Sequence, residues 1–159
     1  MKENNEEINN DNHSYIDQKT ASNLLAMEKY FVENQKIKFP ILGAGRQKID
    51  LVSKNHRELF CLDINCNNID IERKTLQNRA RTNIILARLD IGHPHRNPDN
   101  EFFPGTHLHL YKEGDDDSWA VKLPTCFNDC KSIEDYLACF MEYCKIISNQ
   151  VIETELFNE

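Results

Sequence analysis

Four of the six histidines in this chain of 159 residues lie within one short segment, GHPHRNPDNEFFPGTHLHLY. They are His93, His95, His107 and His109. Imidazole titrates near neutral pH, so two histidines can supply the acid and the base of one reaction. Neutral imidazole nitrogen atoms also bind transition metals. This group of histidines is therefore the strongest indication of chemistry in the sequence.

Alternation of residue types predicts that the segment 106–111 is a strand. Side chains along a strand point to opposite faces in turn, so His107, His109 and Tyr111 are expected on one face. Leu108 and Leu110 occupy the other face, which we expect to be turned toward the core. On the histidine face, the hydroxyl group of Tyr111 could bind a phosphate or orient an imidazole ring.

Turn sequences in the preceding loop explain how the other two histidines could approach this strand. Asn97-Pro98-Asp99-Asn100 and Pro104-Gly105 each favour a chain reversal. We therefore expect His93 and His95 to return toward the two histidines of the strand. Three charged residues are expected near the same end of the neighbouring strand: Arg88, Asp90 and Arg96.

One interpretation of the histidine cluster is acid–base catalysis on a phosphodiester. His107 and His109 would form the acid–base pair, and Tyr111 would orient it. RNA supplies its own 2′-hydroxyl nucleophile, so such an enzyme would be a ribonuclease that needs no metal or other cofactor. Planar guanidinium groups match phosphate oxygens. Three further residues would therefore bind the phosphate: Arg88, Arg96 and His95.

Two other interpretations remain open. The four histidines, with Asp90 or Asp99, could bind a transition metal such as zinc, which three imidazoles hold in some enzymes. Alternatively, the histidines lie on a solvent-facing strand, where they only stack and form local hydrogen bonds. The sequence contains no HExxH motif that would favour the metal.

Composition limits the class of protein. Apolar residues make up 40% and the formal net charge is −7, so a folded core is expected and indiscriminate coating of nucleic acid is not. No apolar run approaches the length of a membrane span, and the first residues lack the apolar region of a signal peptide. These features favour a cytoplasmic protein without membrane contact. The six cysteines form no CxxC pair, so we expect reduced structural thiols.

Charge is unevenly distributed along the chain. Most of the acidity lies in residues 1–12 and 151–159, whereas residues 73–96 contain six basic side chains and a single acidic one. This basic stretch could bind an anionic ligand. It could equally be a solvated strand face whose arginines pair with the acidic residues 115–117.

The pattern of elements predicts an α+β fold. A helix capped by Asp17 or Thr20 is expected to run to about Asn34, and a second helix begins after Ser132, where Asp135 completes a capping box. Between them, alternating segments predict an antiparallel sheet of about five to six strands flanked by the two helices. The expected strands are 49–53, 57–64, 69–72, 82–91, 106–111 and 118–123. We expect a disordered acidic arm at 1–15, one domain at 16–150 and an acidic tail at 151–159.

Several short motifs follow one another between Arg81 and Pro124. They are LDI at 89–91, HRNPD at 95–99, PG at 104–105, HLHLY at 107–111, EG at 113–114 and WA at 119–120. In this order they resemble a family of small uncharacterised bacterial and phage proteins. Asn100 stands where the family pattern has glycine, and asparagine also tolerates a left-handed backbone. The resemblance carries no established activity, but the family's link to mobile elements implies a role in conflict between phage and host.

Together these observations predict a protein directed to RNA or another phosphate-bearing ligand, with a metal-independent endoribonuclease as the enzyme class. The alternative is a non-catalytic inhibitor or binding protein of a defence or toxin system, whose acidic ends would contact a basic protein partner. Catalysis requires the histidines, whereas an inhibitor acting through charge would tolerate their replacement and lose affinity with rising salt. An exposed edge strand would also permit a homodimer.

Overall fold

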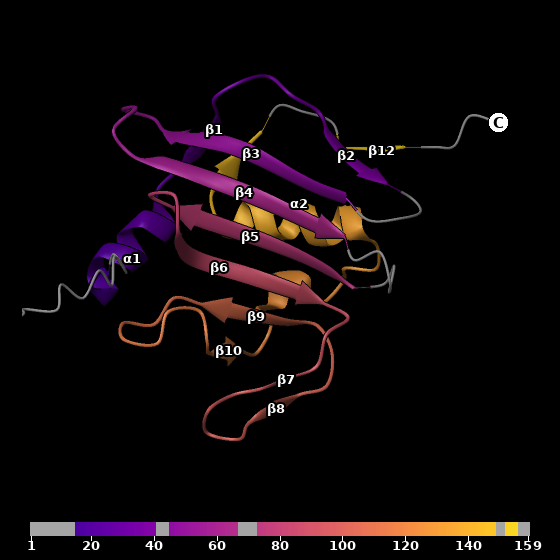
Figure 1. Cartoon of the computed structure of the whole chain (residues 1–159). Coiled ribbons are helices and arrows are strands. Elements are labelled where there is room, and N and C mark those ends of the chain that lie inside the picture. Colours follow the sequence, from indigo (N-terminus) through magenta and orange to yellow (C-terminus); the bar gives the residue numbers. More distant parts are fainter. Residues whose placement is uncertain (1–14, 41–44, 67–72, 149–151, 156–159) are drawn as a thin grey trace, which may run out of the picture.

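Alternating apolar side chains build one large sheet, which dominates the computed structural model in Figure 1. The structure describes residues 15–40, 45–66, 73–148 and 152–155. Neighbouring strands of the sheet are antiparallel, except that β1 and β11 are parallel. In order across the sheet, the eight strands are β10 (Ala120–Val121), β9 (His107–Leu110), β6 (Ile84–Ile91), β5 (Lys74–Ala80), β4 (Leu59–Cys66), β3 (Gly45–Ser53), β1 (Lys29–Phe31) and β11 (Ile146–Ile147).

Two helices begin at the caps that the sequence predicts. α1 (Gln18–Ala26) follows Asp17, whose carboxylate accepts a hydrogen bond from the backbone N–H of Thr20. α2 (Ile133–Tyr143) follows Ser132, and the predicted capping box is present there. A short 3-10 helix, η1 (Thr125–Phe127), precedes α2.

The hydrophobic core lies between these helices and one face of the sheet. Leu24 of α1 and Leu137 and Phe140 of α2 belong to the same buried cluster as the apolar side chains of the central strands. Figure 1 shows α2 behind those strands. Both helices therefore cover one face and leave the other for polar side chains.

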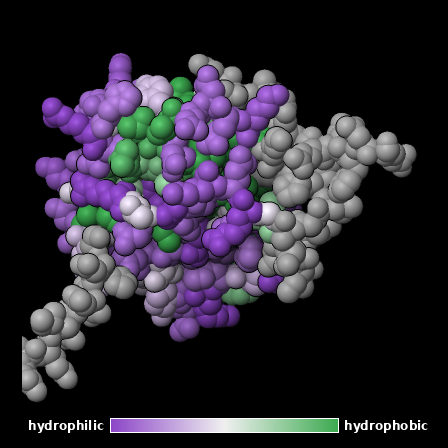
Figure 2. Space-filling model, turned by 45° about the horizontal axis from the view of Figure 1, so that its top comes forward, coloured by the Kyte–Doolittle hydropathy of each residue, from purple (hydrophilic) through white to green (hydrophobic). Residues whose placement is uncertain are grey.

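The uncovered face carries polar residues in rows across the strands. Because of the strand register, Asp63, Gln77, Arg88 and His109 form one row; Asn65, Thr75, Asp90 and His107 form the next. Figure 2, with the top of Figure 1 turned forward, shows mostly hydrophilic side chains around a smaller hydrophobic area. His109 and His107 of β9 are therefore the last members of these two polar rows.

Two pairs of short strands lie outside the large sheet. β7 (His95–Arg96) and β8 (Phe102–Phe103) form an antiparallel hairpin, which lies beside β9 and β10 in Figure 1. β2 (Ile37–Pro40) and β12 (Ile152–Glu155) pair in parallel. The first of these pairs belongs to the segment that carries the histidines.

The sequence predicts the fold class but underestimates the sheet. The helices flank a sheet of eight strands, more than the expected five to six. The first helix ends at Ala26 rather than near Asn34, because Lys29–Phe31 pairs with β3. The strand expected at 69–72 lies outside the described residues, as do residues 1–14 of the predicted arm and most of the predicted tail.

Within the part of the chain that the structure describes, no helix has both the length and the apolar character needed to cross a bilayer.

Candidate functional site

Strand register places two histidines against a charged pair on the neighbouring strand. In the ladder between β6 and β9, His107 lies opposite Asp90 and His109 lies opposite Arg88. The Nε2 atoms of the two rings are 2.9 Å apart, and each lies 3.4 Å from Oδ2 of Asp90. Both histidines are buried, with 1% and 0% of their surface exposed. The expectation of solvent-facing histidines is therefore wrong for this pair.

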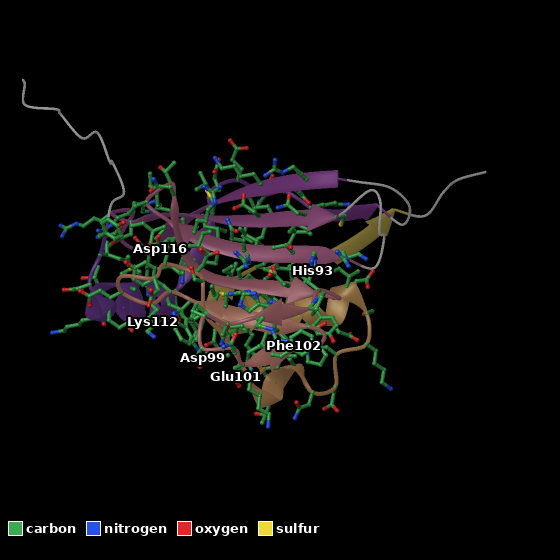
Figure 3. All side chains as sticks on the ribbon, turned by 60° about the horizontal axis from the view of Figure 1, so that its bottom comes forward. His93, Asp99, Glu101, Phe102, Lys112 and Asp116 are labelled. Carbon is green, nitrogen blue, oxygen red and sulfur yellow. The ribbon has the colours of Figure 1, made fainter. Side chains whose placement is uncertain are left out.

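The β7–β8 hairpin brings a third histidine to the pair. The His95 ring stacks on that of His107, with 5.2 Å between centroids, and meets the His109 ring edge-on at 4.5 Å. Asn100, near the turn of the hairpin, has a φ of +72°, the left-handed conformation that asparagine tolerates. Figure 3 labels His93 at the start of this segment, and Asp99, Glu101 and Phe102 around its turn.

A buried asparagine fastens the hairpin to the sheet. The side-chain amide of Asn97 donates to the carbonyl of Ala120 and accepts from its N–H, each at 2.8 Å. The same amide oxygen lies 3.0 Å from Nε2 of His95. Asn97 therefore holds both the edge strand β10 and the third ring of the cluster.

These hydrogen bonds fix which nitrogen carries the proton on two of the rings. Oδ1 of Asn97 is an amide oxygen and has no proton to donate. Nε2 of His95 is therefore the donor in the contact between them. Nδ1 of His107 lies 2.9 Å from the carbonyl of Gly105, so Nδ1 is the donor there. The neutral rings therefore keep their lone pairs on Nδ1 of His95 and on Nε2 of His107.

Asp90 connects the histidines to the rest of the polar face. Its carboxylate accepts from Nε of Arg88 at 3.1 Å and from the Thr75 hydroxyl at 3.3 Å. Arg88 also forms an ion pair with Asp117, in the turn before β10. The guanidinium predicted to bind phosphate is thus held between two carboxylates.

Burial and neighbouring charge act in opposite directions on the ionisation of this cluster. Burial would raise the pKa of Asp90, but its contacts with His107 and His109 and the charge of Arg88 hold it well below its usual range. Burial alone would lower the pKa of His107, but its contacts with Asp90 and the Gly105 carbonyl raise it. Burial and the proximity of His109 lower the pKa of His95. Asp90 is therefore a carboxylate, and His95 is neutral, at neutral pH.

The structure separates the remaining predicted residues from the histidines. The Tyr111 hydroxyl donates to the carbonyl of Ile16 at 2.7 Å and accepts from its N–H at 3.3 Å, so it docks the start of α1. Tyr111 does not share the histidine face, because β9 ends at Leu110 and the tyrosine belongs to the hydrophobic core. The guanidinium of Arg96 donates to the carbonyl of Asn100 and lies over the Phe102 ring.

The three converging histidines fit a metal ion. One ring nitrogen from each of His95, His107 and His109 lies within 4.8 Å of the others. Among the described residues, this group includes neither His93 nor Asp90. Zinc binds imidazole nitrogen at about 2.0–2.1 Å, so the ligand atoms of a tetrahedral site are about 3.3 Å apart. The distances of 2.9 Å between the two Nε2 atoms and 3.4 Å to Asp90 lie close to that spacing.

The fold and the site define an α+β protein. Its buried histidine cluster lies on the face of the sheet that the helices do not cover, beneath the β7–β8 hairpin. Residues 16–146 match the profile of a family described as "Family of unknown function (DUF6978)", and the chain belongs to this family. This agrees with the resemblance to an uncharacterised family. The comparisons with curated proteins and with solved structures found no match.

Sequence reasoning missed one residue that organises the site. The sequence places Asn97 only in a turn, although its side chain holds His95 and β10. Asp117 belongs to the acidic run 115–117, whose pairing with the arginines is one of the two expectations for the basic stretch, and the fold shows that its partner is Arg88. The clustered histidines are a signal for the site, whereas Asn97 has no local pattern that indicates its partners.

Proposed function

We propose that this protein binds a zinc ion through His95, His107 and His109, with Asp90 as the fourth ligand. The observation that carries the proposal is the convergence of three histidine nitrogens from two segments of the chain. Ligand histidines usually donate their second ring nitrogen to a protein oxygen. His95 and His107 do so toward Asn97 and the Gly105 carbonyl.

The burial of the cluster favours a structural role for the ion. Structural zinc sites have four protein ligands, whereas catalytic sites keep one position open for water. His107 and His109 are covered, and Asp90, whose Oδ2 lies 3.4 Å from each of their Nε2 atoms, would move toward His95 to take the fourth position. The ion would hold the β7–β8 hairpin against β6 and β9. An ion with four protein ligands has no open position for catalysis, which supports the non-catalytic binding protein over the enzyme.

The same contacts weigh against acid–base cleavage of RNA by His107 and His109. A phosphodiester would have to reach Nε2 atoms that are buried and already face one another. It would also have to displace Asp90 and Asp117 from Arg88. The experiment that tests the zinc site also tests the prediction that His107 and His109 cleave RNA.

The test is the metal content of protein purified without a His tag, followed by titration of the chelator-treated protein with zinc. We expect one zinc per chain and a lower thermal unfolding temperature after chelation. His95→Asn and His109→Gln should weaken zinc binding by at least about 100-fold. His93→Gln and His56→Asn are the matched controls and should bind zinc as the unaltered chain does. His95 is only partly buried, so His95→Asn is the variant better able to fold.

RNA cleavage, measured with and without chelator, separates the two interpretations. One zinc ion bound per chain, in a protein that does not cleave RNA, supports the proposal. Cleavage that resists chelation and is lost in His107→Gln, in a protein that binds no zinc, would replace the zinc site by the acid–base pair. Protein that neither binds zinc nor cleaves RNA would leave the histidines with a purely structural role and refute both.

A further inference from the structure

Two cysteines meet beside the second helix, far along the chain from the histidines. Sγ of Cys130, two residues before the helix cap, lies 3.2 Å from Sγ of Cys139 within α2. The Cys139 thiol also lies 3.1 Å from the backbone carbonyl of Cys126. Both members of the pair are partly exposed. Small reagents can therefore reach two thiols that are already in contact.

The other cysteines have different surroundings. Cys61, Cys66 and Cys144 are buried, and Cys144 is fully enclosed in the core beside α2. They fit the small, hydrophobic role expected of free cysteine. Cys126 is exposed, but it contacts the pair through its backbone carbonyl. The Cys130–Cys139 contact is thus the feature that the fold positions for chemistry between two sulfur atoms.

We propose that Cys130 and Cys139 form a modification site, a dithiol that a low-molecular-weight disulfide converts into an intramolecular disulfide. A disulfide bond is about 2.05 Å long, so the two sulfur atoms need to approach by only about 1.2 Å. Cys130 lies in the loop between η1 and α2, where the chain can adjust without breaking the helix. The inference concerns thiols outside the histidine cluster and does not depend on the zinc proposal.

The thiols are hydrogen-bonded to one another and to the backbone. The Cys130 thiol donates to Cys139, and the Cys139 thiol donates to the Cys126 carbonyl. In the reaction, one of the two thiols loses its proton and attacks one sulfur of the small disulfide, and an S–S bond to that sulfur forms as the first small thiolate leaves. The other thiol then loses its proton and attacks the protein sulfur of this mixed disulfide, which releases the second small thiolate. In sum, two protein thiols become one disulfide and the small disulfide becomes two thiols.

The resulting bond would join the middle of α2 to the loop that leads into it. α2 supplies Leu137 and Phe140 to the core, and its first turn is held by the capping box at Ser132. Closing the loop between positions 130 and 139 restricts the unfolded chain and leaves the helix in place. Oxidation should therefore make the start of α2 more resistant to unfolding.

The test exposes the folded chain to oxidised glutathione and identifies the product by mass spectrometry after thiol alkylation and proteolysis. We expect the mass to fall by two hydrogen atoms and the peptides containing Cys130 and Cys139 to be linked. We also expect the unfolding temperature to rise and to return to its starting value with a reducing agent. Cys126→Ser is the matched control and should form the same link.

Two further variants complete the test. Cys130→Ser and Cys139→Ser should each abolish the link, and circular dichroism shows whether they fold. If either fails to fold, the peptide map of the unaltered chain and of Cys126→Ser still decides the question. A link between Cys126 and Cys139, glutathione left attached to one cysteine, or an absence of oxidation under conditions that oxidise a small dithiol would overturn the proposal.

Discussion

Tyr111 shows how the end of a strand can reverse the role expected of a single side chain. Continued alternation would have placed its hydroxyl beside His107 and His109. The hydroxyl instead exchanges two hydrogen bonds with the backbone of Ile16, and the ring is buried in the core. Tyr111 is therefore a tether for α1.

This tether gives the first prediction. Tyr111→Phe keeps the ring and removes both hydrogen bonds, which should lower the free energy of unfolding by about 1–2 kcal/mol. Zinc affinity should not change, because the hydroxyl does not touch the histidines. Urea unfolding and zinc titration of the same protein provide the measurements. A loss of zinc binding at unchanged stability would mean that the tyrosine acts at the histidine cluster after all.

At the level of residues, the sequence indicates which histidines matter but not how they are used. Spacing alone brings His93, His95, His107 and His109 into consideration, and the structure places the last three together. The residues that decide their chemistry are different. Asn97 and the carbonyl of Gly105 select the protonated nitrogens, and these contacts depend on the folded path of the hairpin.

Among the elements, the β7–β8 hairpin depends most on one side chain. Asn97→Ala would leave the N–H and carbonyl of Ala120 without their partner and release His95. We expect the free energy of unfolding to fall by about 2–3 kcal/mol and zinc affinity to fall by about 10–100-fold. Thermal unfolding and zinc titration measure the two effects.

A second asparagine in the same hairpin provides the control for this prediction. Asn100 has a φ of +72°, and glycine adopts that conformation without strain. Asn100→Gly should therefore change stability by no more than about 0.5 kcal/mol and leave zinc affinity unchanged. Equal effects of Asn97→Ala and Asn100→Gly would show that any change in the turn disturbs the hairpin, and would remove the special role of Asn97.

Elements could be predicted from sequence where their signals are local. The caps at Asp17 and Ser132 are short patterns, and both helices begin there. The end of α1 is set by a partner elsewhere, because Lys29–Phe31 hydrogen-bonds to β3. β5 lies in a stretch rich in charged and polar residues, where one buried alternating face is easily overlooked.

For the whole molecule, Lys29 is a central connection. Its side chain is fully buried, and Nζ donates to the carbonyls of Leu25, Met27 and Cys144 at 2.9, 2.9 and 2.7 Å. These carbonyls lie at the ends of α1 and α2. A lysine on an inner strand thus joins both helices to the sheet.

This lysine predicts a dependence of stability on pH. Burial lowers the pKa of Lys29 from 10.5 to about 8. Between these values the unfolded chain binds more protons than the folded one, so the contribution of Lys29 to stability rises with pH. Lys29→Met should lower the free energy of unfolding at pH 7 by about 2–4 kcal/mol, because three carbonyls lose their donor. The difference between the two proteins should then widen by about 1–3 kcal/mol by pH 10.

Urea unfolding of both proteins at several pH values between 7 and 10 measures this effect. The comparison cancels the titration of other lysines and tyrosines that the two chains share. A constant difference across the range would show that Lys29 keeps its proton in the folded protein.

The size of the sheet could not be predicted because its outer strands are short and pair with distant parts of the chain. β11 and β10 have two residues each, and β1 has three. β1 and β11 are joined in parallel across more than a hundred residues of sequence. Such strands have no alternation to detect, and their pairing emerges only when the whole domain closes.

The backbone of Ala120, on the edge strand β10, is protected from pairing with a strand of another copy. Sheets with unpaired outer strands recruit further strands from other copies, and repeated recruitment leads to fibrils. Here the Asn97 amide mimics a peptide group and fills both backbone positions of Ala120. A strand of another copy could pair with β10 at Ala120 only after the two hydrogen bonds between Asn97 and Ala120 break and the hairpin moves away. Whatever anchors the hairpin therefore also closes this position of the β10 edge to a strand from another copy.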